Sequence, residues 1–208
     1  WPILLIMAEP KTIAADLKEV VPGLFHWSIH DERIDFQSDS YAIKTADGRV
    51  LIDPVQLKPG LLEKLEPISA IILTCGSHQR SAWRYRKEFQ AQVYAPALSK
   101  EIEEKPDHRY SDGDALPGNL KAVFTPGAGT TQHTLLNQGE PKFAICPDLL
   151  MGNPDGSIEV ISEEYAHDVN LAKESIKKLL DLPFSILCLS HGGPVTDNPK
   201  EKIRAALG

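Results

Sequence analysis

The chain has 208 residues and a formal net charge of −7, and its 42% hydrophobic and 25% charged residues are typical of a soluble globular protein. This composition excludes a disordered chain, and the acidic balance argues against a general nucleic-acid binder, which needs a basic surface. The three cysteines, at positions 75, 146 and 188, lack CxxC spacing and cannot all pair. Unpaired cysteines are typical of a reducing compartment, so we expect a cytoplasmic protein.

The chain begins with an apolar segment over residues 1–7. It lacks the charged start of a signal peptide, and it is much shorter than the roughly 20 residues of a membrane span. We predict a single domain over residues 1–208, with residues 1–20 as an N-terminal extension. We expect no membrane partner.

Hydrophobic periodicity and turn residues predict many short elements in the first half of the chain. An Asp47-Gly48 turn predicts a hairpin. The unbroken apolar run at 68–74 predicts a strand buried on both faces. In chain order the expected elements are strands at 24–30, 41–45 and 49–53, a helix at 59–65, a strand at 68–74, a helix at 81–89, a strand at 92–94 and a helix at 98–104.

The second half continues in the same way, and its longest element is a helix at 169–180 with an apolar face. In chain order we expect strands at 120–125, 134–137, 142–146 and 158–161, the helix at 169–180, a strand at 185–189 and a helix at 200–207. Strands and helices alternate, but hairpins are mixed in. This order excludes a purely parallel doubly wound sheet and favours mixed sheets with outer helices.

Reactive residues gather where the predicted strands end. Loops after buried strands are common places for functional sites, because the strands are rigid and the loops can vary. Asp53 ends one apolar strand. The other reactive segments are residues 74–80, residues 125–134 with 146–148 just beyond them, and residues 189–194.

This order of motifs resembles that of the metallo-β-lactamase superfamily. The matching features are the Asp53 strand end, the Thr74 loop, the Thr-Pro-Gly turn at 125–127, a segment at 143–152 similar to the family's FTGDxLxxG, and Ser190-His191-Gly192. The resemblance implies an α+β protein, a four-layer αββα sandwich of two mixed β-sheets flanked by helices. It also implies hydrolysis of esters, lactams, thioesters or phosphodiesters with one or two metal ions, usually zinc.

The ligand pattern of the family is depleted in this sequence. Only its bridging carboxylate, Asp148, and its last histidine, His191, are present. The family's T-H-x-H-x-D-H loop keeps its threonine, and the third histidine of the family falls at about Gly129. The loop's four ligand positions hold Cys75, Ser77, Gln79 and Arg80.

The remaining ligands suggest a partial metal site. Catalytic zinc needs three protein ligands, and Asp148 and His191 supply two. Cys75 is a possible third, because a thiolate is a strong zinc ligand. We therefore expect either no cofactor or one zinc ion, and we take the same three residues as catalytic candidates. Each also has a structural reading: a histidine bonded to backbone, a salt-bridged carboxylate and a buried apolar thiol.

Arg80 places a permanent positive charge where a second metal's ligand would lie, and this charge repels a dication. We hypothesise that Arg80 replaces the metal as the countercharge of Asp148, through a forked pair of hydrogen bonds. We also assign Arg80, together with His78 and His133, to substrate binding. The two histidines lie near the motif positions, although the family has no ligand there.

Three functions follow from these residues. The leading one is a degenerate metal-dependent hydrolase of an ester, thioester, lactone or phosphoester. The second is a catalytically inactive protein that binds a small molecule through Arg80, Asp148 and His191. The third is a metal-free hydrolase with Cys75 as nucleophile and His191 as base. All three expect a small-molecule ligand and no nucleic-acid partner.

Overall fold

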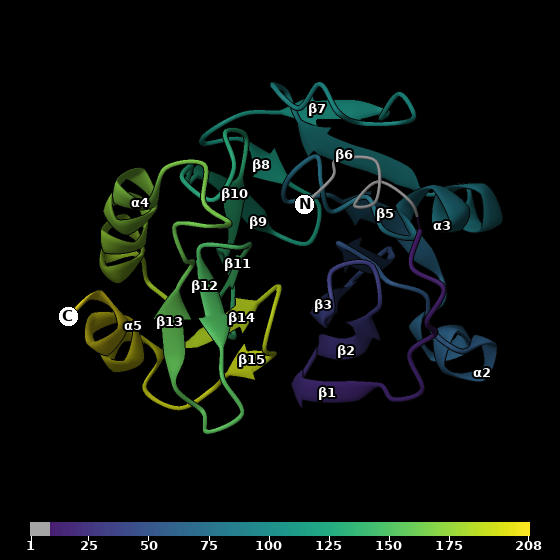
Figure 1. Cartoon of the computed structure of the whole chain (residues 1–208). Coiled ribbons are helices and arrows are strands. Elements are labelled where there is room, and N and C mark those ends of the chain that lie inside the picture. The colour runs from purple at the N-terminus through teal and green to yellow at the C-terminus, as the bar shows by residue number, and fades with distance from the viewer. Residues whose placement is uncertain (1–8) are drawn as a thin grey trace. The chain divides into compact units, whose positions relative to one another are not determined.

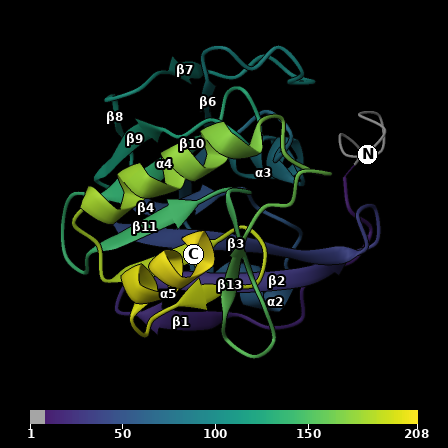
Figure 2. The ribbon, with the colours of Figure 1, turned by 60° about the vertical axis from the view of Figure 1, so that its left-hand side comes forward.

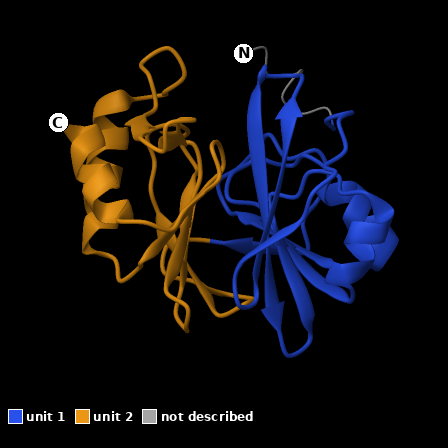
Figure 3. Cartoon of the chain, turned by 90° about the horizontal axis from the view of Figure 1, so that it is seen from below, with its two compact units in different colours: residues 1–110 blue, residues 111–208 orange. Residues whose placement is uncertain are grey.

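The computed structural model describes residues 9–208, so the apolar segment at 1–7 lies outside the described residues. The chain divides into two compact units, unit 1 over Trp1–Tyr110 and unit 2 over Ser111–Gly208 (Figures 1 and 3). Each unit contains one main β-sheet and its own helices, and each is described by itself. The single domain over residues 1–208 stays a prediction.

Unit 1 contains a seven-stranded sheet whose strands lie in chain order. The first four strands form an antiparallel meander, and the last four pair in parallel. A parallel pair needs a crossover connection, whereas antiparallel neighbours need only a hairpin. The strands are β1 (Lys18–Val21), β2 (Leu24–Asp31), β3 (Phe36–Thr45), β4 (Gly48–Ile52), β5 (Ile68–Ile72), β6 (Gln92–Pro96) and β7 (His108–Tyr110).

The helices of unit 1 provide two of these crossovers. Helix α2 (Pro59–Leu62) and the 3₁₀ turn η1 (Glu63–Leu65) connect β4 to β5, and α3 (Ala82–Phe89) connects β5 to β6. Within unit 1 they lie on one side of the strands (Figure 3). Their buried side chains join those of the strands in one apolar cluster that includes Leu62, Leu65, Trp83, Tyr85, Trp27, Leu51, Ile71 and Val93.

Unit 2 contains a six-stranded mixed sheet in the order β15-β14-β11-β10-β9-β8 and a separate hairpin of β12 and β13. Only β11 and β14 pair in parallel. The strands are β8 (Ala115–Leu116), β9 (Leu120–Phe124), β10 (His133–Asn137), β11 (Phe143–Cys146), β12 (Leu150–Gly152), β13 (Ile158–Val160), β14 (Ile186–Leu189) and β15 (Pro194–Val195).

Helices α4 (Val169–Asp181) and α5 (Pro199–Leu207) cover one face of this sheet (Figure 2). Asp168 caps α4, because its side chain accepts hydrogen bonds from the N–H groups of Asn170 and Leu171. The helix buries one apolar stripe against the strands, as its periodicity predicts. The buried residues of this stripe are Ala172, Ile176 and Leu179.

The predicted strands and helices are mostly confirmed, with one clear error. Residues 98–104 form no helix. Instead, the segment leaves β6 in a turn closed by a hydrogen bond from Ser99 N to Pro96 O, and side-chain contacts hold its backbone beyond that turn. The sequence also gave no sign of β1, β7, β8, β12 and β15, which have 2–4 residues each and are too short for a period to show. Within residues 9–208, no helix has both the length and the apolar character needed to cross a membrane.

Candidate active-site loops

The loop between β5 and α3 carries most of the reactive residues of unit 1. It follows the central parallel strand β5, which pairs with β4 on one side and β6 on the other. The hydroxyl of Tyr110 donates to the carbonyl oxygen of Leu73 at 2.6 Å and so fixes the start of the loop. Burial strongly raises the pKa of Tyr110, helped by the nearby Asp53 and Cys75, which keeps this hydroxyl a donor.

Asp53 fixes the loop from the end of β4. Its Oδ1 accepts the N–H of Thr74 at 2.8 Å, and its Oδ2 accepts the hydroxyl of Thr74 at 2.5 Å. The same Oδ2 lies 3.0 Å from Nδ1 of His78. A buried carboxylate accepts hydrogen bonds and donates none, so Nδ1 carries the proton. The side chain therefore both ties the loop to the sheet and sets the tautomer of His78.

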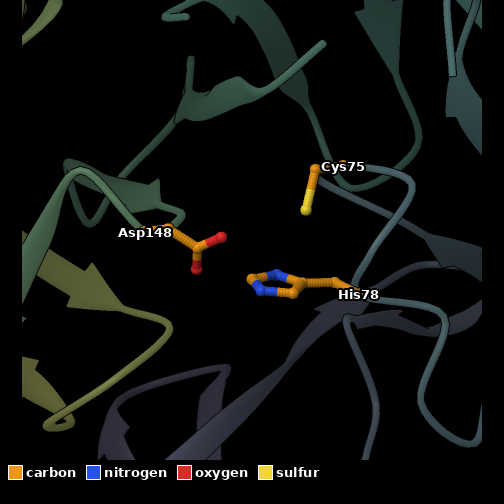
Figure 4. Close-up of side chains that lie close together, drawn as sticks. All are labelled: Cys75, His78 and Asp148. Atoms are coloured by element: carbon orange, nitrogen blue, oxygen red, sulfur yellow. The ribbon is translucent and has the colours of Figure 1, made fainter. Parts of the chain in front are cut away.

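Cys75 and His78 lie on this loop, three residues apart (Figure 4). The Sγ atom of Cys75 lies 3.1 Å from the hydroxyl oxygen of Ser77. A ring nitrogen of His78 lies within 4.8 Å of the same sulfur. Both residues are buried, at 2% and 6% exposed. The structure thus brings together two of the predicted site residues within unit 1.

Gln79 stands at a metal-ligand position of the family but has a structural role here. Its Nε2 donates to the carbonyl oxygens of Gly76 and Glu101, at 2.9 and 3.2 Å. Its Oε1 accepts from Nε1 of Trp83 and from the N–H of Glu103, at 2.9 and 2.7 Å. The amide, which is 1% exposed, therefore ties the loop to α3 and to the segment after β6.

We expect Gln79→Ala to lower the free energy of unfolding by about 3 kcal/mol, because it leaves several buried polar groups unpaired at once. Urea denaturation followed by circular dichroism measures the loss. The matched control is Gln92→Ala, which changes an exposed glutamine of the same unit and is expected to cost at most about 0.5 kcal/mol. Equal losses for the two variants would contradict the structural role of Gln79.

Arg80 lies at the next ligand position, and its guanidinium points to backbone oxygens of unit 1. Its Nη1 donates to the carbonyl oxygens of Asp39 and Asp53, at 2.5 and 2.9 Å. Its Nη2 is buried and has no hydrogen-bond partner among the described residues. The residue is 4% exposed and adopts a left-handed backbone with φ of +43°. Such a conformation is uncommon for a residue other than glycine.

Buried acidic groups surround this arginine. Asp39 lies 2.6 Å from Nε2 of His26. Asp31 pairs with Arg33, whose Nε donates to its Oδ1 at 2.8 Å. Burial alone would raise the pKa of Asp31, but the hydrogen bonds and charge of Arg33, together with the charge of Arg80, hold it below its usual value. Arg80 thus contributes positive charge to a buried acidic region.

In unit 2, the loop after β11 carries Asp148, which is also drawn in Figure 4, and the loop after β14 carries His191. Nε2 of His191 lies 3.2 Å from Oδ1 of Asp148. Gln132 donates to Oδ2 of Asp148 at 2.9 Å, while its Oε1 accepts the N–H of Gly129 at 2.8 Å. The structure therefore brings the predicted pair Asp148 and His191 together within one unit.

Gln132 is a residue that the motif pattern missed. Its amide connects the Gly129 turn, where the family has a histidine ligand, to the remaining carboxylate. The only available signal was its place beside His133 in the polar run at 129–134. A hydrogen bond between segments this far apart in the sequence leaves no periodic pattern.

His133 begins β10 and is buried against Phe124, with ring centroids 5.2 Å apart. Its Nδ1 lies 3.0 Å from the carbonyl oxygen of Thr131. Burial lowers the pKa of His133, and the Thr131 contact and the nearby Asp112 and Asp114 only partly offset this effect. The ring is therefore a neutral group within unit 2, and its predicted contact with substrate stays a prediction.

The donor chemistry of unit 1 does not fit a two-metal centre. Of the family's four ligand positions in this loop, only Cys75 offers a good metal ligand. The amide of Gln79 and the guanidinium of Arg80 are bound to protein groups of unit 1. A single-metal site of Cys75, Asp148 and His191 draws on both units and stays a prediction, as does the pairing of Arg80 with Asp148.

Mixed sheets with outer helices define an α+β protein, and its reactive loops lie at strand ends. A family profile described as the metallo-β-lactamase superfamily matches residues 17–203. The chain therefore belongs to the metallo-β-lactamase superfamily. Curated protein sequences give no match.

Solved structures confirm the predicted fold class. A metallo-β-lactamase superfamily protein from Sulfolobus tokodaii is similar, with a TM-score of 0.65 and 16% identity, covering 82% of this chain and 78% of that one. A metallo-β-lactamase from Pontibacter korlensis has a TM-score of 0.72 and 14% identity, covering 92% and 98%. FIM-1 from Pseudomonas aeruginosa, in its mono-zinc form, has a TM-score of 0.72 and 15% identity, covering 96% and 97%. At these identities the similarity shows the fold alone.

Proposed function

We propose that this protein is a hydrolase of the metallo-β-lactamase superfamily that works without a two-metal centre. Its substrate is an ester, thioester, lactone or phosphoester of a small molecule. The observation that supports the proposal is the structural use of Gln79 and Arg80, which stand at two of the family's ligand positions.

Rebuilding a second metal position would be costly. Turning Gln79 away would leave buried donors and acceptors of three segments unpaired, at about 1–3 kcal/mol for each group. Moving Arg80 would remove the donor that Asp39 O and Asp53 O share. Even then, neither side chain is a common zinc ligand. Adding the second metal therefore requires different residues, and not only different rotamers.

The proposal allows one metal ion at most. A zinc ion would use Asp148, His191 and Cys75, which are carboxylate, imidazole and thiolate ligands of the types that zinc prefers. When bound, it would supply Lewis-acid chemistry. Arg80, His78 and His133 are proposed to contact the substrate. A cytoplasmic location, a small-molecule ligand and the lack of nucleic-acid or membrane partners belong to the same proposal.

Metal content tests the proposal directly. We expect no more than one zinc ion per chain by elemental analysis, in protein incubated with excess zinc and then freed of unbound metal by gel filtration. If zinc binds, Asp148→Asn lowers its content, whereas Cys188→Ala, which changes a buried strand residue, does not. Hydrolysis of p-nitrophenyl acetate and p-nitrophenyl phosphate is followed with and without EDTA. Two zinc ions per chain together with EDTA-sensitive hydrolysis would overturn the proposal.

A second candidate is a ligand-binding protein without turnover. The observation that favours it is the buried Nη2 of Arg80, a donor with no partner among residues 9–208. In this reading Arg80 supplies positive charge beside Asp148 in place of the metal. A double-mutant cycle with Arg80→Met and Asp148→Asn tests the pairing. We expect the effects of the two substitutions on the free energy of unfolding to depart from additivity by about 1 kcal/mol or more. Additive effects would contradict the pairing of Arg80 with Asp148.

A further inference from the structure

We propose that Cys75, His78 and Asp53 form a thiol–imidazole–carboxylate triad that hydrolyses small acyl esters or thioesters through an acyl-enzyme. This inference rests on the proposed function, since it needs a hydrolase without a two-metal centre, and it applies to the form in which no zinc ion is bound to Cys75. It also narrows the substrate to an acyl compound. All three residues belong to unit 1, so the triad is complete within one compact unit.

Asp53 is the best-fixed member and acts as the positioning residue. Three donors converge on its carboxylate: the N–H and hydroxyl of Thr74 and Nδ1 of His78. Such a carboxylate favours the histidine tautomer with the proton on Nδ1 and the lone pair on Nε2. It also stabilises the imidazolium that forms when the histidine accepts a second proton. The arrangement matches the logic of a nucleophile, a base and a group that orients the base.

Cys75 and His78 lie near each other on the loop, and proton transfer requires the imidazole and the sulfur to come closer together. A ring nitrogen of His78 and the Sγ atom lie within 4.8 Å of each other on one short loop (Figure 4). Contacts between nucleophile and base are often long in ligand-free enzymes and tighten when substrate binds. The low exposure of both side chains strengthens the electrostatic effect of Asp53.

The backbone around the triad is strained at two positions. Asp53 and Arg80 have φ values of +45° and +43°. Arg80 donates to the carbonyl oxygen of Asp53 at 2.9 Å, so one strained residue holds the other. Strain of this kind persists only where surrounding contacts enforce it, and it is common at functional sites. The two strained residues are therefore Asp53, which carries the carboxylate, and Arg80, which holds the backbone of Asp53 in place.

The reaction balances without a metal or a redox partner. His78 takes the proton of the Cys75 thiol as the sulfur attacks the acyl carbon. The bond from that carbon to the leaving oxygen or sulfur then breaks, and His78 gives its proton to the leaving alcohol or thiol. In the second half, His78 takes a proton from water as the water oxygen attacks the acyl-enzyme. The carbon–sulfur bond breaks, the carboxylic acid leaves, and the thiol regains the proton from His78.

The base in this mechanism is His78, whereas the motif pattern alone predicts His191 as the base for Cys75. His191 lies in unit 2, 3.2 Å from Asp148. His78 lies in the same loop as the thiol and has its tautomer set by Asp53. The family has no metal ligand at the position of His78, so this role is independent of the family's metal chemistry.

Two measurements on the full chain test the triad. The first incubates the protein with p-nitrophenyl acetate and EDTA and uses mass spectrometry of peptides to find an acetyl group. We expect acetylation of Cys75 and hydrolysis that Cys75→Ala abolishes. His78→Gln should lower kcat about 100-fold. Asp53→Asn should lower kcat with little change in KM, since asparagine keeps the shape and tolerates the left-handed backbone. Cys188→Ala is the control that keeps the activity.

The second measurement needs no substrate turnover. Iodoacetamide should alkylate Cys75 about ten-fold faster than the fully buried Cys188, and His78→Gln should slow alkylation of Cys75 by a similar factor. Equal rates at the two cysteines, or no effect of His78→Gln, would overturn the triad even if no ester is cleaved. Hydrolysis that resists EDTA but survives Cys75→Ala would also overturn it, while leaving the proposed function intact. Hydrolysis that needs two zinc ions would overturn both.

Discussion

Replacing Arg80 with methionine is expected to lower the free energy of unfolding by about 3–5 kcal/mol, one of the two largest effects we expect in this protein. The guanidinium is buried and donates to the carbonyl oxygens of Asp39 and Asp53. Its charge also helps to keep the pKa of the buried Asp31 below its usual value. Methionine fills a similar volume but leaves two carbonyl oxygens without this donor and the buried acids without this charge.

The control for this prediction is Arg84→Met on the neighbouring helix α3. Arg84 pairs with Glu9 at 2.6 Å, but its side chain is 48% exposed. Exposed ion pairs contribute roughly 0–1 kcal/mol, so this variant should stay close to the original protein. Both substitutions replace arginine with methionine, so the difference between their losses in free energy of unfolding reports the effect of burying the guanidinium. Urea denaturation followed by tryptophan fluorescence measures both, and equal losses would show that Arg80 does not stabilise the fold.

Arg80 also marks the limit of what the sequence could predict. Its position in the family's loop was visible from the motif, and so was the conflict between a guanidinium and a metal ion. The partner was not, because its hydrogen bonds go to backbone carbonyl oxygens, which every residue has and no side-chain pattern reveals. The motif instead predicts Asp148 as the partner of Arg80, because Asp148 is the carboxylate that the motif contains.

Hydrogen bonds between distant parts of the chain leave no local sequence pattern, and this also explains which helices and strands the sequence predicts correctly. Strand β5 and helix α4 have long apolar patterns, and both were found close to their observed ends. The segment at 98–104 has helix-forming residues but no helix. Gln79, from a different part of the chain, binds its backbone at Glu101 O and Glu103 N. Local preference predicts structure where burial agrees with it, and fails where a distant side chain supplies the hydrogen bonds.

Gln79 and Gln132 extend this argument to the site. Each is an amide near a position where the family has a ligand, and each joins segments far apart in the sequence. An amide can donate and accept at once, so it can connect backbone groups that a carboxylate or imidazole would connect only in part. The sequence showed that ligands were missing. The structure shows that hydrogen-bonding residues hold the loops in each unit.

Gly127→Ala is expected to lower the free energy of unfolding by at least about 4 kcal/mol, because its methyl group has no space. The methyl carbon would lie 2.2 Å from the nitrogen and 2.3 Å from the Cα of Ala172, which are backbone atoms of α4. The turn cannot easily retreat, since Ser175 donates to Pro126 O at 2.6 Å and Asp168 N donates to Gly127 O at 2.8 Å. Gly127 also has a φ of +135°, which disfavours alanine.

Gly113→Ala is the control that separates the cost of backbone strain at positive φ from the cost of the steric clash at Gly127. Gly113 has a φ of +85° and nothing within 4 Å of the added methyl group, so its substitution should cost only about 1–2 kcal/mol. Urea denaturation of both variants gives the difference, and equal losses would show that α4 or the turn can shift. The comparison also gives the Thr-Pro-Gly motif a physical meaning. The motif predicted membership of a catalytic family, but in unit 2 its glycine is required because a helix backbone passes directly over it.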